Sequence, residues 1–323
     1  MYDLISIGEM LIDFTPSGNN AAGFPLYAQN PGGAPANVAC AMAKLGGKTA
    51  FVGKVGKDTF GLACKKALED AGCDSRYLVF SPLGTTLAFV ALAADGNRDF
   101  SFYRNATTAD VNLLPEDIPG EVYTGGKIFH FGSLSLTEEP CRTTTLEAVR
   151  KAKAAGALIS YDPNLRPPLW SSLEEAKTMI LEAMPLADMV KISEEEREFL
   201  FGNLPEDQVG VKLSQEYGAK ITVITKAKNG CTAFANGRRY DAGAYAVDTI
   251  DTTGAGDAFW AGFLLKLLQT GKVVDQLSDT NIGYMLAYAN ALGSLVTTKR
   301  GAIAAIPTED EIETCIANVP IIK

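Results

Sequence analysis

Strand-like and helix-like segments alternate along most of the chain, and this order constrains the fold more than any other feature. Residues 125–134, 157–164 and 187–193 have patterns typical of strands. Residues 140–156 and 172–184, between them, have patterns typical of helices. Strands interleaved with helices of this length require a mainly parallel sheet covered on both faces. We therefore expect an α/β fold.

The first quarter of the chain follows the same order. Residues 2–14 begin with the alternation of a strand and carry Asp13 at its end, where we expect a site-forming turn. Residues 36–47 predict a helix that stops at a double glycine, which is typical of helix C-termini. A strand is predicted at 48–56 and a second glycine-terminated helix at 58–72.

One region breaks the alternation. Residues 85–105 contain two β-like runs joined around Asp95 and Gly96, which is a hairpin signal with no helix between the runs. The polar stretch between Asp13 and Pro31 is suited to join this antiparallel insert in a small sheet. We expect one α/β domain over residues 1–323, with a β lid formed by inserts at about 14–30 and 85–112.

Composition and charge exclude several classes of partner. The chain has a net charge of −9 and a pI near 4.8, whereas a nucleic-acid surface needs clustered lysine and arginine. The longest apolar runs are far shorter than a bilayer span or carry a charge, and no basic segment followed by an apolar stretch opens the chain. We expect a cytoplasmic protein without nucleic-acid or membrane partners.

The cysteines and the single histidine argue against a metal centre. The six cysteines form no C-x-x-C pair and no zinc-like cluster, so we expect buried thiols. His130 is the only histidine, which excludes His-rich metal sites and a Ser-His-Asp triad. We expect His130 to be a packed strand residue.

The stretch "DTTGAGDAFWAGF" at 251–263 points to anion chemistry. The residues that follow Asp257 are apolar enough for a buried helix, so Gly254, Ala255 and Gly256 would present backbone amides at its positive end. An acid beside a bound phosphate is unfavourable unless it accepts a proton from the attacking nucleophile, so we interpret Asp257 as a general base. The helix end should keep this carboxylate ionised and weakly basic. The alternative is a glycine turn whose aspartate only caps a helix.

Familiar nucleotide motifs are missing. The "GGKT" at 46–49 is not a P-loop, because the first glycine of that motif would fall at Met42. The fingerprints of dinucleotide-binding folds and of protein kinases do not occur either. Any phosphate chemistry must therefore use another scaffold.

Several polar residues could complete a site. Gly32 and Gly33 allow close approach of a ligand, and the amide of Asn37 suits a polyol hydroxyl, with a helix cap as the alternative. Other candidates lie at predicted strand ends, in the insert or in the "YDPNLR" segment, each with the alternative of a surface or turn residue: Asp13, Arg104, Asp162, Asn164 and Arg166.

Together these motifs resemble the two signatures of the ribokinase-like (PfkB) carbohydrate kinases, a double glycine followed by Asn37 and a late D-T-T-G-A-G-D-A-F. The resemblance covers nearly the full length. The segments "GEMLIDF", "PGGAPANVA", "GKVGKDTFG", "FSFYRN", "SYDPNLRPPLW" and "KISEEE" occur in order and look like fructokinases within that family. It implies a ribokinase-like fold.

The resemblance also implies roles for individual residues. Asp257 is the base, and the amides of Gly254, Ala255 and Gly256 hold the developing phosphate charge. Arg166 matches an arginine near the transferred phosphate. The positions that match sugar contacts are Asp13, Gly32, Gly33, Asn37, Arg104 and Asp257.

Nucleotide and metal positions follow in the same way. The positions that match nucleotide contacts are Lys191, Glu196, Lys226, Gly230, Gly254, Gly256 and Asn290. Glu196 corresponds to an acid that organises Mg²⁺ indirectly, and Asp251 and Thr253, with the backbone near Gly301, match a monovalent-cation site. Two positions depart from the family pattern: Ser193 replaces an asparagine, and Ala227 replaces the first glycine of a G-x-x-G loop.

The resemblance implies an ATP-dependent kinase that phosphorylates a primary hydroxyl of D-fructose to give fructose 6-phosphate. Its cofactors would be ATP and Mg²⁺, with K⁺ as a further candidate. The alternatives are a kinase for 2-keto-3-deoxygluconate, ribose or a nucleoside, a non-catalytic sugar-binding regulator, and a dinucleotide oxidoreductase. The apolar alternation of the insert also makes a homodimer through the lid a candidate assembly.

Overall fold

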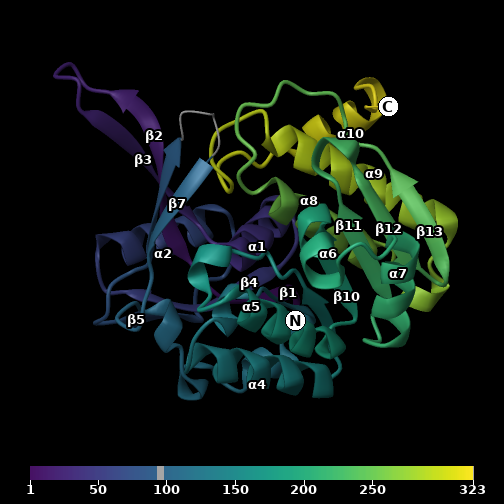
Figure 1. Ribbon diagram of the computed structural model, residues 1–323, viewed down its shortest axis with the longest axis horizontal. Coiled ribbons are helices and arrows are strands. Elements are labelled where there is room, and N and C mark those ends of the chain that lie inside the picture. The colour runs from purple at the N-terminus through teal and green to yellow at the C-terminus, as the bar shows by residue number, and fades with distance from the viewer. Residues whose placement is uncertain (93–97, 323) are drawn as a thin grey trace.

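A computed structural model describes residues 1–92 and 98–322, and the side chains of residues 91, 92 and 98–100 are outside that description. The expected turn around Asp95 and Gly96 therefore lies outside the described residues. In the described chain a nine-stranded sheet has the order β13-β12-β11-β10-β9-β8-β1-β4-β5 (Figure 1). The strands are β1 (Tyr2–Ile7), β4 (Thr49–Gly56), β5 (Leu78–Ser81), β8 (Gly126–Phe131), β9 (Leu158–Tyr161), β10 (Met189–Ser193), β11 (Ile221–Thr225), β12 (Cys231–Ala235) and β13 (Arg238–Ala242).

This sheet is parallel from β5 to β11, and β12 and β13 continue it as an antiparallel edge. The helices are α1 (Ala34–Lys44), α2 (Thr59–Asp70), α3 (Glu121–Thr124), α4 (Cys141–Ala154), α5 (Leu173–Ala183), α6 (Glu194–Phe201), α7 (Glu206–Gln215), α8 (Ala255–Gln269), α9 (Asp279–Val296) and α10 (Glu309–Asn318). The predicted mainly parallel α/β fold is confirmed.

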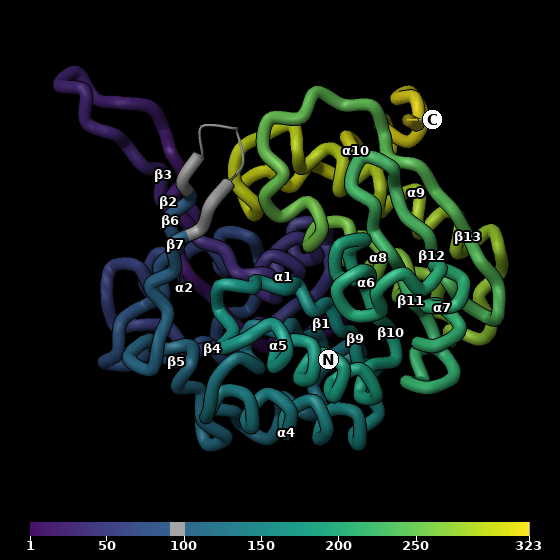
Figure 2. The backbone as a smooth tube through the Cα atoms, in the orientation of Figure 1, coloured from purple at the N-terminus to yellow at the C-terminus, as the bar shows by residue number. Residues whose placement is uncertain are grey.

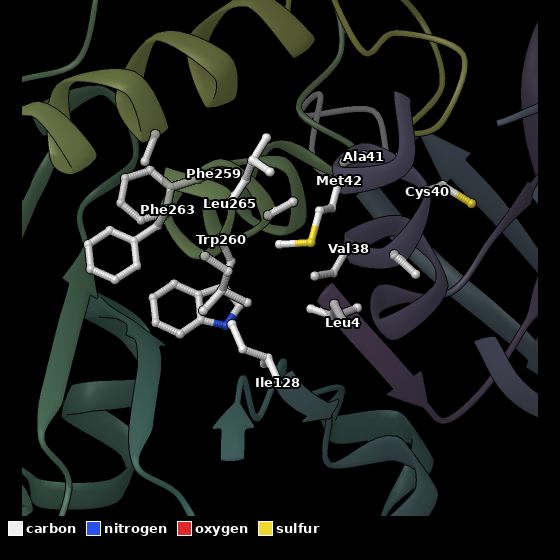
Figure 3. Packing of buried hydrophobic residues seen from close by; sticks show 14 of the residues in the cluster. Leu4, Val38, Cys40, Ala41, Met42, Ile128, Phe259, Trp260, Phe263 and Leu265 are labelled. Carbon is white, nitrogen blue, oxygen red and sulfur yellow. The ribbon is translucent and has the colours of Figure 1, made fainter. Parts of the chain in front are cut away.

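Two apolar clusters, one on each face of the sheet, explain why strand sequences such as β1 are almost continuously apolar. Leu4 belongs to a cluster that also contains Met42 of α1 and Phe263 of α8, all labelled in Figure 3. Ile5 points to the opposite face, where it joins a cluster that contains Val149 of α4. Adjacent residues of a strand face opposite ways, so a doubly covered strand needs apolar residues at both.

The small sheet has the order β3-β2-β6-β7, with β2 (Leu11–Asn19), β3 (Pro25–Gly32), β6 (Leu87–Leu92) and β7 (Arg98–Tyr103). The β2–β3 hairpin projects from the body of the molecule (Figures 1 and 2). The rings of Phe14 and Phe89 stack with centroids 4.8 Å apart on adjacent strands. The expected small sheet, built from the two inserts, is therefore present.

One local expectation was wrong. Residues 2–14 form two strands, β1 and β2, in different sheets, and Asp13 lies inside β2 opposite Asn30 of β3 rather than at a strand end. The residues on either side of the break, Ile7 and Leu11, are both apolar and buried, so the alternation alone did not reveal it. The consequence is that Asp13 is held by the small sheet.

The expected buried thiols are present, since all six cysteines are free and buried. The described residues contain no group of three or more His, Cys, Asp or Glu side chains that could hold a metal ion. Among them, no helix combines the length and apolar character that crossing a bilayer requires.

Candidate active site

A cavity of about 760 Å³ lies where the small sheet, α1 and the first turn of α8 meet. Its lining includes most of the acidic and amide side chains singled out in the sequence. The predicted residues that line it are Asp13, Gly33, Asn37, Asp162, Asn164, Arg166, Lys191, Glu196, Gly254, Gly256 and Asp257.

Asp257 is fixed by two amide side chains from distant parts of the chain. Asn37 Nδ2 donates to one carboxylate oxygen at 2.8 Å, and Asn164 Nδ2 donates to the other at 3.1 Å. Burial and the Asp162 carboxylate raise the pKa of Asp257, although Asn37, Lys191 and Arg166 act in the opposite direction. The expectation of a weak base was therefore wrong, because burial is the largest influence on this carboxyl.

The N-terminus of α8 is shaped by its glycines. Gly254 has φ 75°, and a β-carbon there would lie 2.4 Å from Cβ of Ala302. Only glycine combines that conformation with that contact. The Ala255 amide already donates to the carbonyl oxygen of Thr252 at 3.3 Å. The amides of Gly254 and Gly256 donate to no group of the described chain, so they are the ones available to an anion.

A buried ion pair lies beside this helix end. Lys191 Nζ donates to Asp162 Oδ2 at 2.6 Å, and the same ammonium lies 3.4 Å from where a β-carbon of Gly256 would be. Burial alone would lower the pKa of Lys191, but the Asp162 and Glu196 carboxylates hold it above its usual value. A permanent positive charge thus adjoins the free amides.

The cavity also contains hydrogen-bonding side chains from β2 and α1, Asp13 and Asn37. A β-carbon on Gly32 would be 3.1 Å from Asp13 Oδ2 and 3.6 Å from Asn37 Oδ1, so the absence of a side chain keeps this space open. Asn37 Oδ1 is buried without a hydrogen-bond partner. Burial raises the pKa of Asp13 to about 6; Arg166 opposes the rise, whereas Asp257 and Asp251 reinforce it.

Sequence reasoning missed Glu9, which also lines the cavity. One of its oxygens accepts from the amide of Ala34 at 2.9 Å, and the other is buried without a partner. Burial raises the pKa of Glu9 to about 7. The sequence did contain a signal for this residue, because Glu9 is an acid within the otherwise apolar run "ISIGEMLI".

Arg104 is not where the resemblance suggested. Its guanidinium donates to Asp110 Oδ2 at 2.6 Å, to Thr137 Oγ1 at 2.6 Å and to the carbonyl of Leu134 at 3.0 Å. Its side chain is only 1% exposed and does not line the cavity. In this structure the guanidinium therefore lies outside the cavity, and a direct sugar contact through Arg104 stays a prediction.

Glu196 has a structural role that we did not predict from the sequence. Its carboxylate accepts from the amides of Ser193 and Leu165, both at 2.7 Å, and Ser193 Oγ accepts from the Glu196 amide at 3.1 Å. This reciprocal pair is a capping box, and S-x-x-E at 193–196 was its sequence signal. Both carboxylate oxygens are thus occupied by backbone amides.

A second cavity of about 610 Å³ adjoins the first at the N-terminus of α8. The residues that line both cavities are Ser193, Glu195, Thr225, Thr252 and Gly256. Gly230 and Asn290 line the second cavity as expected, but Lys226 does not, since its ammonium donates to Glu206 at 2.9 Å. Lys228 lines it instead.

The candidate monovalent-cation residues do come together. Asp251 Oδ1 accepts from the amide of Thr253 at 2.9 Å and from its hydroxyl at 2.7 Å. Asp251 Oδ2 accepts from the amide of Gly301 at 3.3 Å. The carboxylate therefore joins the loop before α8 to the loop that contains Gly301.

His130 is a packed residue of β8, as expected. It is buried at 1% exposure, and its Nδ1 lies 2.9 Å from Ser160 Oγ. Burial and the nearby Lys191 lower the pKa of His130 to about 3. The imidazole is thus neutral, and it lines neither cavity.

Comparison with known proteins agrees with this geometry. The model of the pfkB family of carbohydrate kinases matches residues 1–309. The chain belongs to this family. It is 43% identical to probable fructokinase-4 of Arabidopsis thaliana over 316 residues, which are 97% of this chain and 96% of that protein. Membership removes the dinucleotide oxidoreductase from the alternatives.

Solved structures are similar over the whole length. The fructokinase of Xylella fastidiosa with bound ATP has a TM-score of 0.90 and 33% identity, with 98% of this chain and 99% of that chain covered. A double mutant of the Vibrio cholerae fructokinase with fructose, ADP and a potassium ion has a TM-score of 0.86 and 34% identity, with 98% of each chain covered. The ribokinase-like fold inferred from the resemblance is therefore confirmed for this member of the family.

Proposed function

We propose that the protein is an ATP-dependent fructokinase that transfers the γ-phosphate of ATP to a primary hydroxyl of D-fructose, giving fructose 6-phosphate. The observation that carries the proposal is the place of Asp257, on the first turn of α8 where the two cavities adjoin. A sugar in the first cavity would present a hydroxyl to Asp257, and a nucleotide in the second would extend its phosphates to the same helix end. The fructokinase relatives support fructose as the sugar.

Asp257 acts as the general base. Asn37 and Asn164 orient its carboxylate, and its raised pKa strengthens it as a proton acceptor. The hydroxyl proton moves to Asp257 as the sugar oxygen bonds to the γ-phosphorus, and the bond from that phosphorus to the bridging oxygen of ADP breaks. The amides of Gly254 and Gly256, with Lys191, stabilise the charge on the transferred group.

We assign sugar binding to Asp13 and Asn37 in the first cavity. Asp13 and Asn37 Oδ1 accept hydroxyl hydrogen bonds, and Gly32 places no side chain beside either group. Gly33 lines the cavity, and its lack of a side chain lets it pack against the backbone of Glu9. Arg166 lines the same cavity and is assigned to the transferred phosphate. Ala255 supports this helix end through its bond to Thr252 rather than through a free amide.

Nucleotide and metal binding are assigned to the second cavity and the shared rim. Gly230 and Asn290 line the space proposed for the base. Carboxylate oxygens suit Mg²⁺, which neutralises phosphate charge when it is bound with ATP. Glu196 is assigned an indirect role, since both its oxygens accept backbone amides. Asp251 and Thr253 offer oxygens beside the loop of Gly301, which supports K⁺ as a further ligand.

We also propose that residues 1–323 act as one kinase domain and that the inserts at about 14–30 and 85–112 form its lid. The small sheet contributes Leu11 and Asp13 to the cavity wall, so its movement would open or close the site. Its exposed apolar residues support a homodimer through the lid: Phe24 at 66%, Leu26 at 45%, Tyr27 at 44% and Tyr103 at 61% exposure. Unpaired thiols support a reducing, cytoplasmic compartment.

The test is ADP release in a coupled assay with ATP and Mg²⁺. The acceptors are fructose, ribose, 2-keto-3-deoxygluconate, adenosine and glucose. A clear preference for fructose supports the whole proposal. Turnover with another acceptor keeps the kinase chemistry and rejects fructose. No turnover with any of them, from protein shown to be folded, favours the non-catalytic sugar-binding regulator.

A further inference from the structure

Residues 320–322 dock beside the loop that follows β13, next to the second cavity. The amide of Ala246 donates to the carbonyl of Pro320 at 2.9 Å, and the amide of Ile322 donates to the carbonyl of Ala244 at 2.8 Å. Tyr245 and Ile321 pair in an isolated antiparallel bridge. This segment follows α10 and lies beside the loop at residues 243–247, as Figure 2 illustrates. It therefore adds a short strand to that loop.

The two isoleucines of this strand have different surroundings. Ile322 lines the second cavity, whereas Ile321 does not. A β-carbon on Gly243 would come within 2.3 Å of Ile321 Cγ2, so Ile321 packs over Gly243. Ile321 is 54% exposed and Ile322 is 36% exposed. Successive side chains of an extended strand point in opposite directions, which explains the difference.

The lining of the second cavity is mainly apolar. It includes Ala244, Val247, Phe259 and Ile322, and it shares Thr252 and Gly256 with the first cavity. An apolar slot that leads to free amides suits a ligand with a flat aromatic base at one end and phosphates at the other. An exposed isoleucine beside such a slot has apolar surface left for the base to cover.

We infer that Ile322 forms a wall of the nucleotide site and packs against the nucleobase, so the segment after α10 is part of the substrate-binding machinery. The inference rests on the proposed function only in taking a nucleotide as the ligand of the second cavity. It makes Ile322 a determinant of nucleotide affinity that takes no part in the chemistry.

Binding of ADP to the full chain, measured by isothermal titration calorimetry without sugar, tests this inference. Ile322→Ser should weaken ADP binding about three- to tenfold, since a contact of several tens of Å² of apolar surface is lost. Ile321→Ser is the matched control and should change the dissociation constant by less than about twofold. Thermal unfolding of both variants shows whether the segment still folds.

Three outcomes overturn the inference: unchanged ADP binding in Ile322→Ser, equal weakening in both variants, or no ADP binding by the wild-type chain. Equal weakening would mean that the segment supports the fold of the loop rather than contacting the base. Failure of the proposed function has a different signature, since ADP would bind and respond to Ile322→Ser while fructose is not phosphorylated.

Discussion

The two cavities are built on different principles although they share the N-terminus of α8. In the first, charged and amide groups hold one another in place: Asn37 and Asn164 fix Asp257, and Asp162 holds Lys191. The lining of the second is mainly apolar and includes Ala244, Val247, Phe259 and Ile322. A reaction needs groups at defined positions, whereas a contact with a base needs only apolar surface. Substitutions in the first cavity should therefore change turnover or sugar binding, and those in the second should change nucleotide affinity.

The largest effect is expected for Asp257→Asn. Loss of the base should lower kcat by on the order of 10²–10⁴, while ADP and fructose still bind, because the side chain keeps its shape. Steady-state kinetics and calorimetry measure the two quantities separately. Unchanged turnover would reject Asp257 as the base.

Lys191→Met should come next. It should reduce kcat on the order of 10²-fold through loss of charge beside Gly256, and it should lower the free energy of unfolding by about 3 kcal/mol by leaving Asp162 buried without its partner. Denaturant unfolding measures the stability. The double variant Lys191→Met with Asp162→Asn is the control. We expect it to regain stability but not activity; recovery of both would make the ion pair purely structural.

Asp13→Asn should weaken the binding of the sugar but not that of the nucleotide. Losing a charged acceptor should raise KM for fructose roughly ten- to hundredfold and leave ADP binding unchanged. Since the pKa of Asp13 is about 6, its carboxylate gains a proton as the pH falls through 6, so the wild-type KM should rise below that pH. A profile of KM against pH should lose this rise in the variant. A parallel change in ADP affinity would contradict the separation of the cavities.

The smallest effect concerns the loop beside the second cavity. Ala227 has φ 48°, a left-handed conformation that glycine adopts without strain, which explains why glycine is usual at this position in the family. Ala227→Gly should raise the free energy of unfolding by up to about 1 kcal/mol and leave kcat unchanged. Denaturant unfolding provides the measurement. A stability loss would mean that glycine's extra freedom in the unfolded chain outweighs the relieved strain.

Much of the fold was predictable because its signals are local. The order of strands and helices, the insert and the glycines before Asp257 all depend on residues close in the sequence. The break between β1 and β2 was not visible, because the residues that flank it, Ile7 and Leu11, are both apolar. We predicted Glu196 as an acidic site residue but did not predict its capping box with Ser193. The S-x-x-E spacing of these two residues is the usual sequence signal for such a box.

By itself the sequence determined a mainly parallel α/β sheet and a glycine-rich helix start that carries an acid, since periodicity and backbone freedom are properties of short segments. Tertiary structure alone decided which side chains line the two cavities. Asp110 binds the guanidinium of Arg104 outside the first cavity, and Glu206 binds the ammonium of Lys226 outside the second. Burial made Asp257 a stronger base than its helix end would suggest. Partners and burial arise from packing between distant segments, which no local pattern encodes.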